Sequence, residues 1–245
     1  NHDGTDEDIP VETAVVASAS GATDAAGNTD IGNSSPNFEI ATQRPTATVT
    51  VDSDPIFVSD LVQVVTVTYD EPMDAGSNPT ITFGNSGSFT SAGDGAWTVG
   101  NTVWTETFNH DGTSEQFFTE TAEVASNSGA TDVTGNGDIG DTSPTFVLDT
   151  QAPTATVTVS SDPIFLGGLS QVVTVTYDEA MNPGTNPAIT FSSSLNFTSA
   201  GDGAWTVGNT VWTETYDHDG TAEEIAAESA IVANSSGATD VVGNA

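Results

Sequence analysis

The feature that most constrains this chain is an internal repeat with a period of 108 residues. The stretch PTATVTVDSDPIF at Pro45 returns at Pro153 with one substitution, and SAGDGAWTVGNTVWTET at Ser91 returns unchanged at Ser199. Residues 44–137 match 152–245 at 66 of 94 positions, and residues 1–43 match 109–151 at 27 of 43. A period of this length is typical of an independent domain rather than of a solenoid turn. We therefore expect three modules joined end to end: the C-terminal part of one repeat at 1–43, a complete repeat at 44–151, and a repeat at 152–245 that lacks its final strand.

The complete repeat has the pattern of short, half-buried strands. Threonine alternates with apolar residues along 46–51 and again along 65–69, which is the period of two that a strand with one solvated face requires. Further strands are expected at 80–83, 88–91, 96–99, 102–108, part of 120–125, and 145–149. Seven or eight strands in about 100 residues predict an all-β fold of tandem immunoglobulin-like antiparallel β-sandwich domains. No helix is expected, because the helix-compatible segment 223–232 corresponds to 5–16, which carries Pro10.

One hairpin can be placed in register from the sequence. The Gly-Asn pair at 100–101 is typical of a two-residue turn, which puts Val99 opposite Thr102 and Trp97 opposite Trp104. We expect this tryptophan pair, which returns 108 residues later, to pack in the core on the same face as Val99. A glycan-binding aromatic platform is the alternative interpretation.

The charge of the chain excludes several classes of partner. It has 35 acidic residues and one base, Arg44, for a formal net charge of −34. Such a surface can neutralise neither nucleic-acid phosphates nor anionic lipid, so no nucleic-acid partner is expected. Membrane insertion is not expected either, since no apolar run approaches about 18 residues. The chain has no cysteine and therefore no disulfide. A bound cation is the natural candidate for a cross-link between its parts.

Acidic residues are concentrated in loops that the immunoglobulin strand order would bring to one pole of each module. The second strand should end at the pole next to the preceding linker, the sixth strand should end there too, and the loop 130–138 should start there. The residues expected beside this first junction are Asp70, Glu71, Asp111, Asp132, Asn136 and Asp138. The second junction adds Asp149 from its linker to the corresponding residues of the third repeat, Asp178, Glu179, Asp219, Asp240 and Asn244.

Carboxylates and amide oxygens without a basic partner are the ligand set that Ca²⁺ takes, six to eight at a time. Asp outnumbers Glu by 22 to 13, and the Asp residues stand in loops rich in Gly and Asn. The sequence therefore predicts Ca²⁺ at the junctions, with solvation of the protein in a high-salt habitat as the alternative explanation of its acidity. The first junction departs from the pattern, because Ala41 stands where the second has Asp149 and Arg44 stands where the second has Ala152.

The sequence does not favour catalysis. The three histidines, His2, His110 and His218, occupy one position of the repeat, and one histidine per module does not make a hydrolytic metal site. No nucleophile-elbow sequence is present. A glycosidase would need two carboxylates flanking a cleft, which a sandwich with near-identical neighbours does not obviously provide. We expect the chain not to be an enzyme.

Three segments carry a family resemblance. The linker Asp149-Thr-Gln-Ala-Pro-Thr154, the strand 172–181 that ends in Asp-Glu-Ala-Met, and the closing Asp-Val-Val-Gly-Asn of 240–244 resemble the bacterial Ig-like domains of giant repetitive surface proteins. These include calcium-dependent, RTX-type adhesins and related extracellular filament proteins. The resemblance implies domains that hold an adhesive tip away from the cell, Ca²⁺ between domains, and Asp178, Glu179, Asp240 and Asn244 as candidate ligands.

Together these observations predict a non-enzymatic structural repeat of an extracellular adhesin stalk or cell-surface filament, rigidified by Ca²⁺ where modules meet. Its partners would be the neighbouring repeats of the same chain. One alternative is a self-polymerising filament subunit, in which the strand within 35–43 of one copy completes the third repeat of another. A second alternative is a carbohydrate-binding module.

Overall fold

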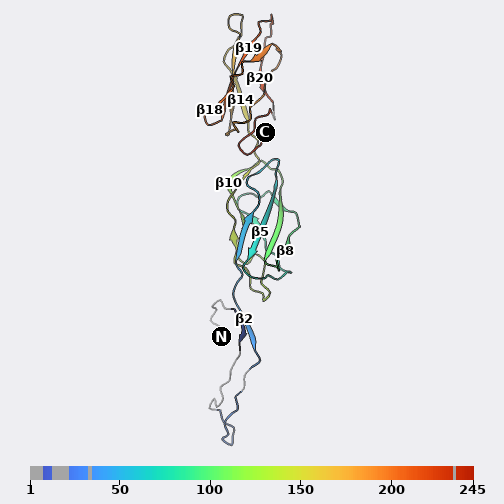
Figure 1. Ribbon diagram of the computed structural model, residues 1–245, viewed down its shortest axis with the longest axis vertical. Coiled ribbons are helices and arrows are strands. Elements are labelled where there is room, and N and C mark those ends of the chain that lie inside the picture. The colour runs from blue at the N-terminus through green and yellow to red at the C-terminus, as the bar shows by residue number, and fades with distance from the viewer. Residues whose placement is uncertain (1–7, 13–21, 33–34, 234–235) are drawn as a thin grey trace.

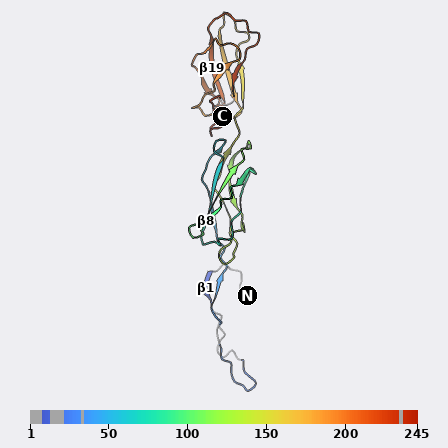
Figure 2. The ribbon, with the colours of Figure 1, turned by 90° about the vertical axis from the view of Figure 1, so that its right-hand side faces the viewer.

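The computed structural model describes residues 8–12, 22–32, 35–233 and 236–245. These residues form strands, turns and irregular segments, and no helix occurs among them, so the prediction of an all-β chain is confirmed. Two β units and an N-terminal strand pair follow one another along the long axis of the molecule (Figure 1; Figure 2). Across the described residues, no helix has the length and apolarity needed to cross a membrane.

With the N-terminal strand pair counted as the first unit, the second unit spans 44–151 and contains three sheets. Its strands are β3 (Ala47–Val51), β4 (Ile56–Phe57), β5 (Val62–Tyr69), β6 (Ile81–Phe83), β7 (Phe89–Ser91), β8 (Ala96–Thr98), β9 (Val103–His110), β10 (Gln116–Glu120), β11 (Ala122–Val124), β12 (Asp141–Thr142) and β13 (Phe146–Asp149). The largest sheet has the order β3-β5-β9-β7, with β8 also paired to β9. The smaller sheets, β10-β13-β4 and β12-β11-β6, complete an arrangement that is consistent with a β-sandwich.

Alternation along β5 shows how the sequence positions the core. Val65 and Val67 are fully buried and Tyr69 is nearly so, whereas the threonines between them face outward. The predicted register of the β8–β9 hairpin is confirmed, because Trp97 pairs with Trp104 and their rings pack edge to face at 5.3 Å. The prediction for Val99 is wrong: it lies in the turn with φ of 51° and is 75% exposed, because the loop takes four residues rather than two.

Strand β13 closes the second unit and is the reason that two unpredicted strands form. It pairs antiparallel with β10 and parallel with β4, and it buries Phe146 and Leu148 in a cluster with Phe83 of β6 and Phe89 of β7. The strands β4 and β10 have short or non-alternating sequences. They become strands because a segment about 30 to 90 residues away in the chain supplies their hydrogen bonds.

The third unit repeats this plan, with one difference. Its strands are β14 (Ala155–Val159), β15 (Ser170–Tyr177), β16 (Ile189–Phe191), β17 (Phe197–Ser199), β18 (Ala204–Thr206), β19 (Val211–His218) and β20 (Ala230–Val232). They form the sheet β14-β15-β19-β17, with β18 also on β19, and the pair β16-β20. Residues 164–165 and 224–228, which correspond to β4 and β10, are not strands. In the second unit both corresponding segments pair with β13, and the positions 108 residues after β13 lie past residue 245.

The N-terminal pair consists of β1 (Asp8–Glu12) and β2 (Phe38–Ala41). Asp8 pairs with Ala41 and Glu12 with Phe38, in the register and with the irregularity that β10 and β13 show 108 residues later. Within the predicted partial repeat at 1–43, the structure thus describes one strand pair with the register of β10 and β13. His2 and the rest of 1–7, 13–21 and 33–34 lie outside the described residues.

Candidate cation site at the second junction

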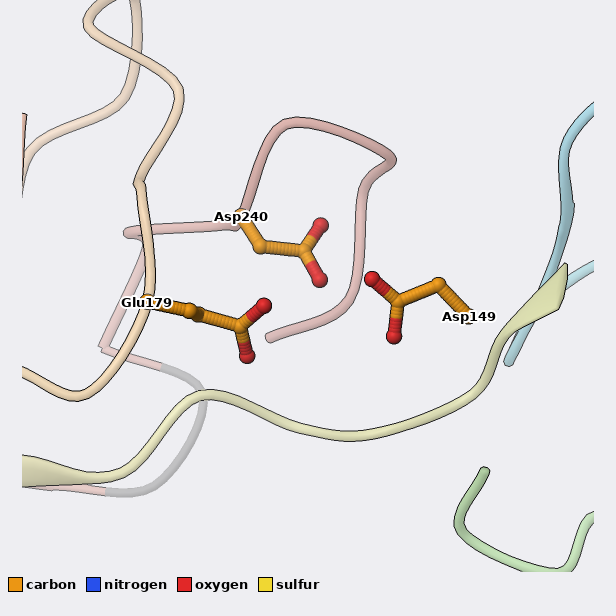
Figure 3. A group of neighbouring side chains, drawn as sticks. All are labelled: Asp149, Glu179 and Asp240. Atoms are coloured by element: carbon orange, nitrogen blue, oxygen red, sulfur yellow. The ribbon is translucent and has the colours of Figure 1, made fainter. Parts of the chain in front are cut away.

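Three carboxylates from two successive units meet at the linker between them. Asp149 ends β13 of the second unit, Glu179 follows β15 of the third, and Asp240 opens the last loop of the third. One oxygen of each lies within 4.8 Å of the others. Figure 3 shows the three side chains pointing toward one another. Among the described residues this is the one group of three side chains whose spacing suits a metal ion.

The loop 240–244 holds Asp240 rigidly. Its Oδ1 accepts hydrogen bonds from the backbone N–H groups of Val242, Gly243 and Asn244 at 2.9, 2.6 and 2.9 Å, and the side chain is fully buried. The same loop forms at Asp132, which accepts from the N–H groups at 134, 135 and 136. A third copy of the loop forms at Asp24, whose Oδ1 accepts from the N–H groups of Ala26 and Asn28. The geometry is therefore encoded locally, because an Asp side chain readily caps the turn that follows it.

Asp149 is 1% exposed, yet it has few donors for a buried carboxylate. Gln116 Nε2 donates to its Oδ2 at 2.9 Å, and the Gln151 N–H donates to its Oδ1 at 3.2 Å. Burial, and then the nearby charge of Asp240, raise the pKa of the Asp149 carboxyl above its ordinary value.

Glu179 is the least satisfied of the three. Its Oε2 accepts from Gln116 Nε2 at 3.1 Å, while its Oε1 is buried and accepts no hydrogen bond. Burial together with the negative charges of Asp149, Asp240 and Asp178 raises the pKa of Glu179 to about 7. The site is thus a place where negative charge is unfavourable unless a cation balances it.

Asn244 contributes to this junction as a clamp. Its Nδ2 donates to the Asp149 carbonyl oxygen and to Asp240 Oδ2, both at 2.8 Å, and its Oδ1 accepts from the Val58 N–H at 2.9 Å. Because the amide oxygen already has a partner in the second unit, Asn244 joins the two units rather than pointing at a cation. The counterpart Asn136 likewise donates to the Ala41 carbonyl at 3.0 Å.

The first junction is built on the same loop with a different charge balance. Its counterparts of the three carboxylates are Ala41, Glu71 and Asp132, so the linker position has no acid. The β1–β2 register does place an acidic residue, Asp8, opposite Ala41, where the second junction has Gln116 opposite Asp149. Burial alone would raise the pKa of Asp132, but hydrogen bonds from Asn136 and residue 134 lower it overall.

Arg44, the only base of the chain, occupies this first junction. Its Nε donates to the Gly137 carbonyl at 2.7 Å, and its Nη2 donates to Asn127 Oδ1 at 3.0 Å and to the Asp138 carbonyl. The guanidinium therefore ties the start of the second unit to the loop that follows Asp132.

Several predicted ligands have structural partners instead. Asp70 and Asp178 each accept from the backbone N–H and hydroxyl of a threonine just after the linker, Thr46 and Thr154. Asp138 is fully buried and accepts from the Tyr69 hydroxyl and from Ser128. These three side chains fasten strands and turns within their own units.

The predicted placement of Asp111 and Asp219 is wrong. Strand β9 runs antiparallel to β5, so Asn109 pairs with Val62 and the end of β9 lies at the pole opposite Tyr69. The third unit repeats this, with Asp217 opposite Ser170. The error came from giving the two neighbouring strands the same direction, and each Asp instead caps its own exposed turn at residues 113 and 221.

The histidines have structural partners as well. His110 Nε2 lies 3.1 Å from Glu115 Oε2, and its Nδ1 accepts from the Gly112 N–H. His218 makes the same contacts with Glu223 and Gly220. Both ring nitrogens are engaged in each case, and the arrangement serves the loop after β9 and β19.

Gln116 is a site residue that the sequence reasoning missed. It bridges Asp149 and Glu179 through one amide nitrogen. A signal for it exists only in the comparison of repeats, where Asp8 and Ala41 at the first junction become Gln116 and Asp149 at the second.

Comparison with known proteins does not assign this chain to a family. No family model, no curated protein and no solved structure matches the chain.

Proposed function

We propose that this chain is a non-enzymatic segment of an extracellular adhesin stalk or cell-surface filament, made of immunoglobulin-like β-sandwich modules and stiffened by Ca²⁺ at the second junction. The observation that carries the proposal is the convergence of Asp149, Glu179 and Asp240 from two successive units, with a buried Glu179 oxygen that accepts no hydrogen bond.

The chemistry of the donor set suits calcium. Three carboxylates provide hard oxygen ligands, and no arginine or lysine is near to neutralise them. Gln116 lies beside these carboxylates, and in the reverse orientation of its amide, which has nearly the same shape, its oxygen would be a further ligand for an ion. Water would supply the remaining ligands, as is common for calcium sites that proteins do not enclose completely.

The position of the site explains how an ion would stiffen the molecule. Asp149 belongs to the second unit and the two other ligands belong to the third, so one ion couples both sides of the linker. The Asn244 clamp spans the same gap and holds the ligand-bearing loop against the linker. Rotation about the linker would have to break both connections.

The arrangement of the units supports a role of the chain as a spacer. They follow one another along one axis (Figure 1), so each added copy extends the reach of the chain by one unit. The tryptophans do not favour a glycan platform, since Trp104 and Trp212 are each 5% exposed and pack within their units.

Thermal unfolding in EDTA, in millimolar Ca²⁺ and in molar NaCl tests this function. With one site at 100 times its dissociation constant, calcium adds about 2.7 kcal/mol. For units of this size that raises the Tm by about 10 °C or more. NaCl without Ca²⁺ should not reproduce the increase.

The matched control is Asp149→Ala, which gives the second junction the residue found at the first. It should abolish the response to Ca²⁺. A Tm that rises equally with NaCl alone, or a calcium response that survives in Asp149→Ala, would contradict the proposed site and favour general solvation of an acidic protein.

A further inference from the structure

The loop at the first junction holds the preceding strand through one amide nitrogen. Asn136 Nδ2 donates to the Ala41 carbonyl at 3.0 Å, to Asp132 Oδ2 at 2.7 Å and to Thr134 Oγ1 at 2.9 Å. The carbonyl belongs to the end of β2, whereas the other two acceptors belong to the second unit. This contact between the units therefore depends on the side chain of Asn136 remaining an amide.

Asn136 precedes Gly137, and this is the one Asn-Gly pair in the sequence. The side-chain amide of an asparagine can react with the backbone nitrogen of the next residue, and glycine hinders this attack least because it has no Cβ. Asparagine accordingly counts among the thermolabile residues of proteins. At the second junction, Asn244 makes the corresponding contacts to a linker carbonyl and an Asp carboxylate, but it precedes Ala245. The two junctions thus differ in the reactivity of the same side chain.

The packing around Arg44 requires the glycine at 137. A Cβ added to Gly137 would lie 2.3 Å from Asn127 Oδ1, the atom that accepts a hydrogen bond from Arg44 Nη2. Arg44 Nε also donates to the Gly137 carbonyl at 2.7 Å. In the third repeat all three positions differ together, as Ala152, Ser235 and Ala245. The Asn-Gly pair is therefore a consequence of how the first junction holds its arginine.

The backbone nitrogen of Gly137 is free to react. Asp132 Oδ1 accepts from the N–H groups at 134, 135 and 136, and the series stops there. The flanking backbone hydrogen bonds run from Asp132 N to the Asn136 carbonyl and from Asp138 N to the Ala130 carbonyl. Within the described part of the chain, the Gly137 N–H donates to no hydrogen bond. The attacking nitrogen has no partner to lose, so only the Asn136 side chain has to move.

We propose that Asn136 is a site of spontaneous deamidation, which converts the amide at the first junction into a carboxylate. The Gly137 nitrogen attacks Cγ of Asn136, the new N–Cγ bond closes a succinimide ring, and the bond from Cγ to Nδ2 breaks. Nδ2 leaves as ammonia and takes the proton of the attacking nitrogen. Water then opens the ring at either carbonyl and leaves aspartate or isoaspartate. The reaction needs no oxidant or reductant, and water is its only co-reactant.

The product weakens the first junction in two ways. A carboxylate at 136 has no hydrogen to donate to the Ala41 carbonyl, so the contact between the units is lost. It also faces Asp132 Oδ2, which Nδ2 contacts at 2.7 Å, and like charges at such a distance repel each other. The isoaspartate product further adds a methylene to the main chain of the loop. An aged chain therefore has a looser first junction, while Asn244 still holds the second.

Peptide mapping of the folded chain after prolonged incubation at mildly alkaline pH tests the proposal. Cleavage after glutamate releases 124–179, which contains Asn136, and 229–245, which contains Asn244, so the second junction is an internal control. We expect deamidation at Asn136 to be at least about tenfold faster than at Asn244. Mass spectrometry detects the replacement of NH₂ by OH, and fragmentation assigns it to the residue. Equal rates at the two asparagines overturn the proposal.

The same chain in denaturant shows whether the folded junction permits the reaction. A folded chain that keeps Asn136 intact while the denatured chain loses it also overturns the proposal, because the hydrogen bonds of the amide would then prevent the attack.

Asn136→Asp reproduces one product and tests the consequence. We expect it to lower the Tm of the second unit by about 4 °C or more, in EDTA and in Ca²⁺ alike, which separates this effect from the cation site. The unaltered chain, once deamidated at Asn136, should show the same decrease. An unchanged Tm in both proteins would contradict a weakened junction.

Discussion

The two junctions place the same Asp-containing loop against linkers of opposite charge. At the first, Arg44 brings a permanent cation that donates to the carbonyls of Gly137 and Asp138, and the linker position is Ala41. At the second, Ala152 replaces the arginine and Asp149 adds a buried carboxylate beside Glu179 and Asp240. At the first junction a permanent cation therefore fastens the end of the linker to the second unit. A joint with only carboxylates carries a charge imbalance that, under our proposal, calcium removes.

The largest test of this contrast is Asp149→Ala compared with the unaltered chain in Ca²⁺. We expect the free energy of unfolding of the third unit to fall by about 2.7 kcal/mol at 100 times the dissociation constant, because the ion loses a ligand from across the linker. Calorimetry with and without EDTA measures the loss. In EDTA the loss should disappear, because Asp149 then only adds unbalanced negative charge, and a loss of equal size there would assign the effect to packing rather than to the ion.

Arg44→Met tests the first junction with a side chain of similar length and no charge. Three hydrogen bonds from the guanidinium are lost, and we expect a destabilisation of the second unit of about 1.5 kcal/mol that does not depend on Ca²⁺. Denaturant unfolding followed by the fluorescence of Trp97 and Trp104 reports on it, in a chain where Trp205 and Trp212 are replaced by Phe. Restoration of the lost stability by calcium would mean that the two junctions are chemically equivalent after all.

The pH dependence of the metal-free protein gives a smaller effect. The folded state raises the pKa of Glu179 from 4.5 to about 7 and that of Asp149 in the same direction, so the folded state binds more protons than the unfolded state between these values. Stability in EDTA should therefore fall as pH rises from about 4.5 to about 7 and level off above that. Tm measured across this range checks it.

Glu179→Gln is the control for this pH effect, and it should flatten the curve. In Ca²⁺ the trend should reverse, since ion and proton compete for the same oxygens. An unchanged downward slope in saturating Ca²⁺ would show that the ion does not bind there.

The smallest expected effect comes from copying the second junction into the first. The double change Asp8→Gln with Ala41→Asp, made in the Asp149→Ala chain, should return a calcium response of about 1 kcal/mol or less, because Arg44 remains nearby. Isothermal titration with Ca²⁺ measures it. If no response returns, the arginine alone decides which junction takes an ion.

Much of the fold could be predicted from the sequence, because alternating threonine and valine specify strands locally. The strands at 46–51, 65–69 and 96–99 were placed to within a few residues, and the Trp97–Trp104 register was correct. The strands β4 and β10 were not found, since their pairing depends on β13 far along the chain. The alternation of residues within a segment does not predict a strand that forms only because a distant segment pairs with it.

The candidate site was predicted less completely. Asp149, Glu179 and Asp240 were identified from their loops and linker. No feature of the sequence separates them from Asp138 or Asp178, whose carboxylates have hydrogen-bond partners within their own units. The pole of Asp111 depended on the direction of one strand, and that direction was assigned wrongly. Gln116 was overlooked because an amide between two carboxylates is visible only in three dimensions.

The Asn244 amide has a consequence for a molecule under tension. It holds the Asp149 carbonyl, the Asp240 carboxylate and the Val58 N–H at once. A pull along the chain therefore does not concentrate on the few covalent bonds of the linker, since part of the load passes sideways into a loop of each neighbour. Loss of this one side chain would remove that path, and the load would fall on the linker and on the contacts of the cation site.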